Sequence, residues 1–326
     1  VVLQNDFANY ERFVLSQFSD VGVTNEKDVT YWSNYLKDFV PTVLKGDREQ
    51  AGGLRTKKTI DIGARLQATS SMLHCTPYSI MLTALNLLLM TYTGQMDIAV
   101  GVEVALRNEP YVSETVGLLV SPIIARNKMD SSMTLEQLVR QVTENTYESM
   151  DHTRVAFRDI LTICKQFSEV HPTNLMFVMQ NVSHDSKLVL PGSTVERVHV
   201  HHNSNMFPMC WNVYLDDTSV TIDIEHSHNY SSEFVNAMLC NYVHILHQVL
   251  DRQNHCAPLC ELSMLSKEEL RSINKFGSGS EVMGGSEMLS LTSELNQRAL
   301  ESPDFIAVKY STPYGSCLDG SLTYSE

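Results

Sequence analysis

The chain has 326 residues, of which 43% are hydrophobic and 8% aromatic, so it can fill one large core or two smaller ones. Its 38 acidic and 24 basic side chains give a net charge of −14 with no local lysine or arginine cluster, which argues against nucleic acid and anionic membranes as partners. No apolar run reaches the ~20 residues that span a bilayer, and the first residues do not resemble a signal peptide, so we expect a cytoplasmic protein.

The cysteines and the two ends of the sequence give further expectations. The seven cysteines form no Cys-x-x-Cys pair and lie mostly in apolar stretches. This pattern predicts reduced thiols in the core and disfavours a redox or zinc site. The sequence opens in a helical pattern and stops in an extended segment, Ser-Leu-Thr-Tyr-Ser-Glu, which predicts a piece of a longer polypeptide.

The first third of the chain predicts helices around a strand. Apolar and aromatic residues recur at helical spacing in residues 7–18 and again in residues 29–39. Residues 55–63 have the composition of a strand. Residues 77–94 follow a cap at Thr76 and are apolar on almost every side, which predicts a helix buried on most of its surface.

The middle of the chain predicts buried strands and a capped helix. Residues 97–105 and 116–126 are nearly continuous apolar runs of strand length, as is typical of sheet interiors. Pro122 places the second of these strands near an edge or a bulge. Thr134 and Gln137 have the spacing of a capping box, which predicts that a helix begins there.

The next part of the chain completes a mixed sheet. Residues 174–181 and 195–200 are predicted strands, and residues 211–226 predict a hairpin that turns at the pair Asp216–Asp217. A stripe of apolar residues in 234–249 predicts a long helix. The fold class that follows is α/β, with helices covering a mixed sheet.

Beyond residue 250 the composition changes. Residues 251–288 contain a short charged helix and a glycine- and serine-rich stretch, and they read as a flexible linker. The glycines of that stretch follow no strand and precede no Lys-Ser/Thr pair, which disfavours a phosphate-binding loop. Residues 291–310 predict a helix and then a strand, so a second domain is expected to begin there.

The histidines form two clusters without the companions that a catalytic or metal site needs. On a strand His199 and His201 share one face while His202 points to the other, so the adjacent pair cannot act from one face. Two ligands are too few for zinc. We interpret these side chains, and likewise His226 and His228, as a solvated or partner-facing strand surface rather than a metal site.

The sequence has none of the common local enzyme motifs. It contains no Gly-x-Ser-x-Gly elbow, no His-Glu-x-x-His helix and no Walker loop, and Asp216 and Asp217 stand where a turn requires polar residues. The residues alone therefore indicate an α/β domain with a truncated neighbour.

A series of segments nevertheless matches one known family in order and separation. The segments are Phe-Ala-Asn-Tyr-Glu-Arg-Phe from Phe7, Tyr-Trp-x-x-x-Leu from Tyr31, the stretch with Gly94, Gln95, Asp97, Gly101 and Arg107, the stretch with Gly117, Val120 and Arg126, the stretch with His152, Val155 and Phe157, and Leu-Thr-Tyr-x-Glu from Leu322. Together they resemble the C-terminal half of a condensation domain of a nonribosomal peptide synthetase, followed by the start of an adenylation domain. The resemblance covers nearly the whole chain.

Some positions differ from the pattern of that family. Ser121 replaces the asparagine of its Val-Asn-Thr motif, Arg154 replaces aspartate and Ala156 replaces proline. Met209 and Cys210 stand where an Asp-Leu pair is usual. These changes concern acceptor preference and the activity of the domain.

The resemblance implies a fold and a division of labour. A condensation domain has two chloramphenicol-acetyltransferase-like lobes around a tunnel that admits phosphopantetheine arms from opposite faces, and this chain is similar to the second lobe. The catalytic signature of the family, His-His-x-x-x-Asp-Gly, belongs to the first lobe. His201 and His202 are followed by Met206 and Phe207 where Asp and Gly are required, so they are not expected to be that signature.

The resemblance also implies the roles of individual residues and segments. Residues 1–250 are expected to be the C-terminal lobe, residues 251–288 an interdomain linker, and residues 289–326 the start of an adenylation domain. No residue of this chain is then catalytic, and none binds a cofactor or metal directly. Family-motif positions with a structural or tunnel-wall role are Arg107, Gly117, Ser121, Arg126, His152 and Phe157.

The implied partners are carrier domains upstream and downstream, with their phosphopantetheine arms, and the N-terminal condensation lobe. ATP and Mg²⁺ are expected for the adenylation domain. The implied function is to help position two carrier-bound thioesters for amide bond formation, as part of a multidomain peptide synthetase, and the fragment by itself is expected to be inactive. Two alternatives stay open, a non-catalytic scaffold that docks carriers and a related ester-forming or starter acyltransferase.

Overall fold

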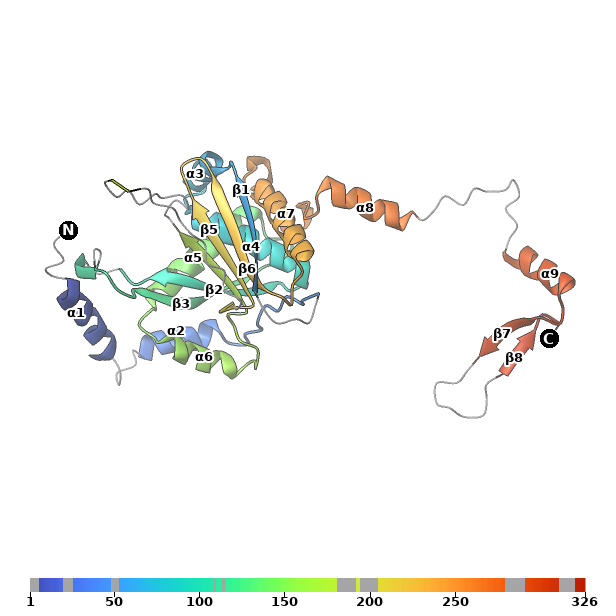
Figure 1. Cartoon of the computed structure of the whole chain (residues 1–326), viewed down its shortest axis with the longest axis horizontal. Coiled ribbons are helices and arrows are strands. Elements are labelled where there is room, and N and C mark those ends of the chain that lie inside the picture. The colour runs from blue at the N-terminus through green and yellow to red at the C-terminus, as the bar shows by residue number, and fades with distance from the viewer. Residues whose placement is uncertain are drawn as a thin grey trace. The chain divides into compact units, whose positions relative to one another are not determined.

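The computed structural model describes residues 6–19, 26–47, 53–107, 110–112, 115–180, 192–193, 205–278, 291–310 and 320–325. Contacts within these ranges divide the chain into two compact units, Val1–Lys267 and Glu268–Glu326 (Figure 1). Each unit contains a sheet of its own.

The first unit is built on a six-stranded mixed sheet in the order β1-β6-β5-β4-β2-β3. Its strands are β1 (Gly53–Ile60), β2 (Asp97–Ala105), β3 (Val120–Lys128), β4 (Leu175–Gln180), β5 (Met209–Leu215) and β6 (Val220–Ser227). β4 runs parallel to its neighbours β2 and β5, and the other three pairs are antiparallel. The predicted mixed sheet is confirmed, and Pro122 lies on the edge strand β3, where a missing N–H is tolerated.

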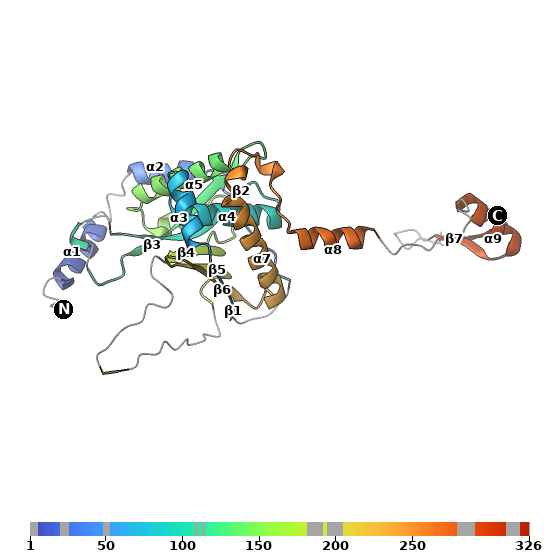
Figure 2. The same ribbon diagram turned by 90° about the horizontal axis from the view of Figure 1, so that it is seen from above.

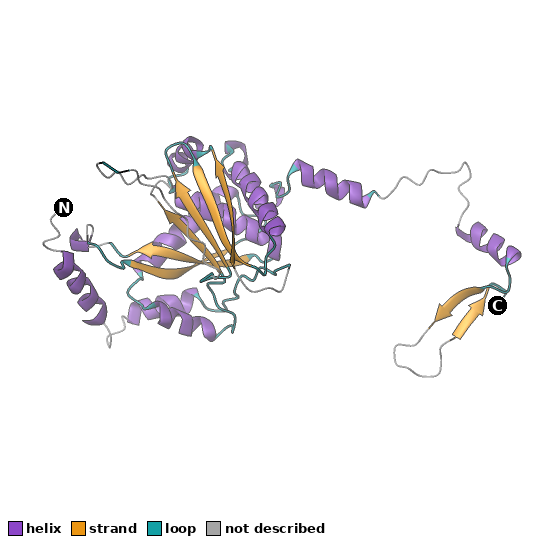
Figure 3. Ribbon diagram, viewed as in Figure 1, coloured by secondary structure: helices purple, strands orange, loops and turns teal. Residues whose placement is uncertain are grey.

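Helices cover this sheet, as Figure 3 shows. The helices of this unit are α1 (Asp6–Ser19), α2 (Glu26–Tyr35), α3 (Gly63–Met72), α4 (Pro77–Thr93), α5 (Leu135–Asp151), α6 (Phe157–Lys165) and α7 (Ser232–Val249), with 3-10 turns at Pro110–Val112, Arg252–Asn254 and Leu259–Glu261. α1 lies beside the sheet and contacts the turn at Pro110–Val112 (Figure 1). α4 and α7 lie against one face of the sheet (Figure 2), where the rings of Trp211 and Tyr242 are 5.0 Å apart and those of Phe177 and Tyr78 are 5.5 Å apart. α2 and α6 contact each other, and α6 contacts the edge strand β3.

Local signals in the sequence explain the ends of α4 and the start of α5. The hydroxyl of Thr76 accepts the backbone N–H of Ser79 at 3.1 Å, and α4 ends at Gly94 with a φ of 69°, as the cap and the glycine predict. At the start of α5 the Thr134 hydroxyl accepts from Gln137 N–H, and the Gln137 side chain accepts from Thr134 N–H. This is the predicted capping box.

Several elements differ from the predictions. β3 begins at Val120, because residues 116–119 are an extended segment outside the β2–β3 pairing. α3 and α6 were not predicted, and α3 begins at Gly63, where the chain passes the β5–β6 turn so closely that a Cβ would lie 2.6 Å from the backbone of Thr218. The predicted strand at 195–200 lies outside the described residues.

The cysteine prediction is wrong in part. Six of the cysteines are described, and none of these six forms a disulfide. Cys164 is buried, but Cys240, Cys256 and Cys260 are exposed, so those three thiols are not in the core. Cys240 lies on α7, where successive positions point to different faces, so apolar sequence neighbours do not bury it. Cys256 and Cys260 lie in the turns after α7.

Residues 251–264 fold back onto the rest of the first unit, and we name them the return segment. The Leu259 N–H donates to the Met133 carbonyl at 2.9 Å, and the Leu135 N–H donates to the Ala257 carbonyl at 3.2 Å. Leu259 and Leu262 are buried in the main core. The contacts therefore divide the chain at Lys267, whereas the expected boundary of the lobe at residue 250 stays a prediction about the family pattern.

The second unit is small. Its elements are α8 (Lys267–Gly277), α9 (Leu291–Glu301), β7 (Ile306–Tyr310) and β8 (Gly320–Thr323), and the last two pair antiparallel. α9 and β7 are the helix and strand that the sequence predicts. Across both units, no single described helix combines the length and apolar character needed to cross a membrane; α3 and α4 meet that requirement only as a pair bent by 98°.

Candidate functional site

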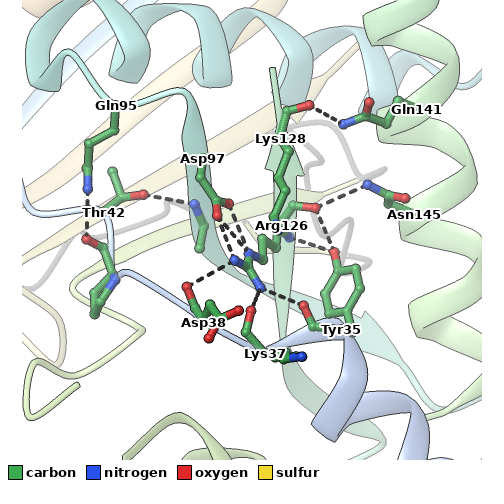
Figure 4. A network of polar contacts seen from close by, with 12 residues as sticks. Tyr35, Lys37, Asp38, Thr42, Gln95, Asp97, Arg126, Lys128, Gln141 and Asn145 are labelled. Atoms are coloured by element: carbon green, nitrogen blue, oxygen red, sulfur yellow. Dashed lines mark hydrogen bonds and ion pairs between the residues drawn. The ribbon is translucent and has the colours of Figure 1, made fainter. Parts of the chain in front are cut away.

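Arg126 is the centre of a polar network on the edge strand (Figure 4). Its guanidinium donates to both oxygens of the Asp97 carboxylate at 2.6 to 3.2 Å, and to the backbone carbonyls of Tyr35 and Lys37 at 2.8 and 2.7 Å. The Arg126 side chain is only 3% exposed, so a buried charge is paired and its donors are used. The network fixes the chain that follows α2 against β2 and β3.

The hydroxyl of Tyr35 closes the open edge of β3 beside this ion pair. It accepts the Arg126 N–H at 2.7 Å and donates to the Arg126 carbonyl at 2.8 Å, where a neighbouring strand would otherwise bond. Asn145 of α5 donates to the same carbonyl at 3.1 Å. Burial raises the pKa of Tyr35 above its ordinary range, so the hydroxyl keeps its proton. These contacts of Arg126 thus all lie within the fold.

His152 lies in a second structural cluster, at the end of α5. Its Nδ1 is 2.6 Å from the carboxylate of Asp28, its ring stacks on Tyr31, and its carbonyl accepts from the Trp32 indole at 2.9 Å. Tyr31 in turn shares a hydrogen bond with Ser149, and burial raises its pKa to about 12. These contacts join α2 to α5, so His152 positions a helix.

Phe157 is the first residue of α6, and its side chain packs against the main core. It lies beyond the His152 cluster in sequence and contributes to the same helical layer beside β3.

Arg107 and Gly117 order the loop that leads into β3. The Arg107 guanidinium donates to the carbonyls of Val112 and Thr115 at 2.7 and 3.0 Å. At Gly117 a Cβ would lie 2.4 Å from the ring of Tyr10 on α1, so a glycine allows α1 to approach. Ser121 is paired with Val104 of β2, and its hydroxyl makes a 3.4 Å contact with the Pro122 carbonyl.

The loop held by Arg107 and Gly117 presents an apolar ridge, which we define as Val116, Leu118 and Val120. Their side chains are 72%, 76% and 43% exposed. Exposed apolar groups side by side mark a surface suited to a partner. Arg107 and Gly117 contact the segment that carries this ridge, and the structural or tunnel-wall role expected for the six motif positions stays a prediction.

A cavity of about 690 Å³ lies at the carboxyl ends of the parallel strands. It is lined by the start of α4 (Thr76, Pro77, Tyr78, Ser79), by α5 (Thr143, Thr146, Tyr147, Met150), by the ends of β2, β4 and β5 (Glu103, Val104, Ala105, Met179, Leu215), and by Gln67, Asp216 and Asp217. Ligands of open α/β sheets bind at this edge. None of the six motif positions lines the cavity, and the sequence analysis did not identify it.

No single segment of the sequence indicates this cavity, because its lining residues come from separate helices and strands. Asp216 and Asp217 were interpreted as turn residues, which they are, since the Asp216 N–H donates to the Ser219 carbonyl at 2.9 Å. The same turn forms one side of the cavity. Only the parallel arrangement of β2, β4 and β5 brings these residues together with α4 and α5.

The structure describes only one of the two histidine clusters. His199, His201 and His202 lie outside the described residues. His226 is fully buried beside Thr56, so its interpretation as a solvated side chain is wrong, because that strand face is covered by helices. Within the described ranges, no group of three or more His, Cys, Asp or Glu side chains is arranged to hold a metal ion.

Comparison with known proteins gives a family match over most of the chain. The family described as the condensation domain matches residues 3–273. Tyrocidine synthase 3 of Brevibacillus parabrevis is 26% identical over 266 residues, which are 80% of this chain and 4% of that protein. The chain therefore spans a small part of the length of this relative. The match ends before residue 289, so the adenylation assignment stays a prediction.

Solved structures share the fold. A four-domain nonribosomal peptide synthetase bound to AMP and glycine superposes with a TM-score of 0.67 at 14% identity, over 92% of this chain and 24% of that one. The first condensation domain of the calcium-dependent antibiotic synthetase, in complex with a substrate analogue, gives a TM-score of 0.62 at 16% identity, over 78% of this chain and 57% of that one. The predicted fold class is confirmed.

Proposed function

The chain belongs to the condensation-domain family, and from this premise we propose that it forms the C-terminal lobe of an amide-forming condensation domain. In this role the lobe helps to position two carrier-bound thioesters inside a nonribosomal peptide synthetase. The cavity at the carboxyl ends of β2, β4 and β5 carries the proposal, since it offers a half-open space of the size that small ligands occupy.

The lobe contributes geometry rather than proton transfer. Attack of an amine on a thioester is favourable, so holding the two groups at attack distance and away from water supplies much of the rate. The Arg126 and His152 networks keep α2, α5, β2 and β3 rigid around the cavity. In this proposal the general base is a histidine of the His-His-x-x-x-Asp-Gly motif in the N-terminal lobe.

The apolar ridge supports an arrangement with two lobes. Val116 and Leu118 lie on the loop that leads into β3, Val120 is the first residue of β3, and all three side chains are exposed. The ring of Tyr10 on α1 packs against Gly117 beside them. We propose that this surface meets the N-terminal lobe, and that phosphopantetheine arms of upstream and downstream carriers enter between the lobes. The arms belong to the carriers and arrive as part of the substrate.

The last residues extend the proposal. Residues 289–326 are proposed to begin an adenylation domain, on the basis of Leu-Thr-Tyr-x-Glu and of the helix α9 followed by β7. ATP and Mg²⁺ belong to that domain and to reactions that the described residues do not perform. A cytoplasmic location stays a prediction.

A non-catalytic scaffold is the second candidate. Ser121, Arg154 and Ala156 depart from the motif residues of the family, and all three lie near the frame rather than the cavity. Under this alternative the lobe docks carriers without supporting amide formation. A related ester-forming or starter acyltransferase would use the same cavity with a different acceptor.

Reconstitution separates these functions. The 326-residue chain is joined to an N-terminal condensation lobe that carries His-His-x-x-x-Asp-Gly, and both carriers are loaded with amino-acid thioesters. We expect an amide product by mass spectrometry from the joined protein, and none from the chain alone or after replacing the second motif histidine by alanine. Carrier binding without any product supports the scaffold. Product from the chain alone contradicts the division between lobes.

A further inference from the structure

The cavity lies where two parallel strands separate. β2 and β4 are paired only at Gly101↔Met176 and Val102↔Phe177. β2 continues to Ala105 while paired with β3, and β4 continues to Gln180 while paired with β5. The strands therefore splay beyond Phe177, and Figure 3 shows β2 and β3 diverging from the rest of the sheet. We name the space between residues 103–105 and 178–180 the fork.

Backbone groups point into the fork. The Leu106 N–H, directly after β2, donates to the Leu119 carbonyl, directly before β3. Peptide directions alternate along a strand, so the peptide groups of Glu103 and Ala105 point away from β3. Two other contacts agree with this alternation. Pro122, which has no N–H, is opposite Glu103, and the Ala99 N–H is donated away from β3, to Thr42.

The same reasoning orients β4. The Asn174 carbonyl accepts from Met209 on β5, so the peptide groups of Phe177 and Met179 point toward β2. The next ladder bonds would join the Glu103 carbonyl to Met179 N–H, and the Met179 carbonyl to Ala105 N–H. No register pair exists there, so two donors and two acceptors of the backbone face the cavity without a strand partner.

The side chains around the fork do not favour an anion. The N-terminus of α4 faces the cavity, but Pro77 has no N–H and the Ser79 N–H is taken by Thr76. The cavity lining contains two aspartates and a glutamate and, among the described residues, no lysine, arginine or histidine. A phosphate group is therefore disfavoured inside the fork.

The remaining walls suit an uncharged, extended chain. Thr143 and Thr146 donate their hydroxyl protons to the Val139 and Val142 carbonyls at 2.7 Å, so toward the cavity they offer only acceptor lone pairs. Met150, Met179 and Leu215 add apolar surface. Alternating backbone donors and acceptors beside an apolar wall recognise amide groups in an extended chain, as an added strand does.

We propose that the fork binds secondary amides in an extended chain through the backbone of Glu103, Ala105 and Met179. The proposal rests on the proposed function, because the carrier-delivered substrate of a condensation domain supplies such amides. They occur both in the pantetheine part of a carrier arm and in the peptide of a growing acyl group. Either source gives the same hydrogen bonds in the fork.

The test uses the whole 326-residue chain, labelled with ¹⁵N, and three probes. The first is pantetheine, the second is N-acetyl-Ala-Ala-methylamide, and the third is the same dipeptide with every amide N-methylated, which has no donors. We expect the amide signals of Ala105 and Met179 to shift with pantetheine, with the dipeptide or with both, and not with the methylated dipeptide. The probe that shifts them identifies the source of the amides.

Two substitutions at one position isolate the backbone donor. Ala105→Pro removes an N–H that no strand partner uses, while Ala105→Val adds similar bulk and keeps that N–H. Loss of one hydrogen bond should weaken probe binding about fivefold in Ala105→Pro and leave Ala105→Val unchanged. Thr143→Phe, which fills the cavity from α5, should abolish binding.

Three results overturn the proposal. They are equal binding by Ala105→Pro and Ala105→Val, equal binding of the methylated dipeptide, and shifts confined to residues outside the fork. These outcomes are independent of amide formation by the joined protein. Activity without fork binding would remove this inference and leave the proposed function standing.

Discussion

The two edges of the six-stranded sheet are protected by different means. At β3 the Tyr35 hydroxyl bonds both peptide groups of Arg126, and the guanidinium of Arg126 holds Asp97 and two carbonyls. At β1 the protection is charge. Arg55, Lys57 and Lys58 lie along that edge, and Arg55 is paired with the buried Asp223 of β6.

The two edges differ in whether their protection depends on the exact placement of hydrogen-bonding groups. The β3 edge lies under α6 and the loop after α2, so its donors and acceptors must be matched one by one. The β1 edge faces solvent in part, and like charges along it repel another strand without any fixed geometry. A single substitution should therefore disturb β3 more than β1.

Removing Arg126 should have the largest effect. Arg126→Ala leaves Asp97 and the carbonyls of Tyr35 and Lys37 without their donor, and breaking a buried pair costs about 3 to 5 kcal/mol. Urea unfolding measures this change. Arg126→Lys keeps the positive charge but loses the planar set of guanidinium donors, so it should recover part of the lost free energy of unfolding. A loss below about 1 kcal/mol would show that the network is not what secures this edge.

Removing Arg55 should cost less, about 2 kcal/mol. Asp223 is 1% exposed and loses its partner, but Lys57 is directly opposite it in the β1–β6 register and Arg55 is itself 28% exposed. The matched control is Arg140→Ala, which breaks a solvent-exposed pair with Glu136 and should cost less than about 0.5 kcal/mol. Equal losses in the two variants would remove the distinction between a buried and an exposed pair.

Tyr35→Phe tests the edge closure alone. The substitution keeps the ring and removes the hydroxyl that bonds the Arg126 N–H and carbonyl, which should lower the free energy of unfolding by about 1 to 2 kcal/mol. Hydrogen exchange at the Arg126 amide should accelerate more than exchange elsewhere on β3. Unchanged exchange at Arg126 would mean that water replaces the hydroxyl without loss.

The smallest effect is a pH dependence near the β1 edge. Burial lowers the pKa of His226 from its ordinary value of 6.5, and its Nε2 is 3.3 Å from the Thr56 hydroxyl of β1. The unfolded chain then binds a proton at higher pH than the folded chain. The stability that His226 contributes is therefore fully present above pH 6.5 and is lost progressively as the pH falls below this value.

The urea concentration at the midpoint of unfolding, measured between about pH 5.5 and pH 7.5, gives the change of stability with pH. His226→Gln should flatten it. His74→Asn, at an exposed histidine with a φ of 51° that asparagine tolerates, should leave the slope as it is. The same slope in all three proteins would assign the effect to other groups.

Much of the fold is readable from the sequence because its signals are local. The cap at Thr76 and the glycine at 94 delimit α4, and the apolar run 97–105 matches β2. α3 has no such signal, since Gly63, Thr69 and Ser70 are among its buried residues and no apolar stripe results. The late start of β3 follows from the loop that Arg107 holds, which is a contact between separate segments.

The candidate site is less readable because it depends on strand register. The motif positions identify the frame, and Arg126 and His152 are held by partners up to 124 residues away in sequence. The cavity depends on where β2 and β4 stop pairing, and no residue type in residues 103–105 or 178–180 announces that point. Register is set by the whole sheet, so a single sequence does not reveal it.

The return segment changes how a downstream domain is tethered. Its backbone bonds to Met133 and Leu135 and its buried leucines hold the chain at the start of α5, so the first unit retains the chain as far as Lys267 and not only to residue 250. A shorter connecting segment raises the effective concentration of a linked domain near the point where it is attached. Substitutions that break the hydrogen bonds of the return segment would free residues 251–264 and lengthen the connection to the second unit. The effective concentration would then fall, although no residue of a docking surface had changed.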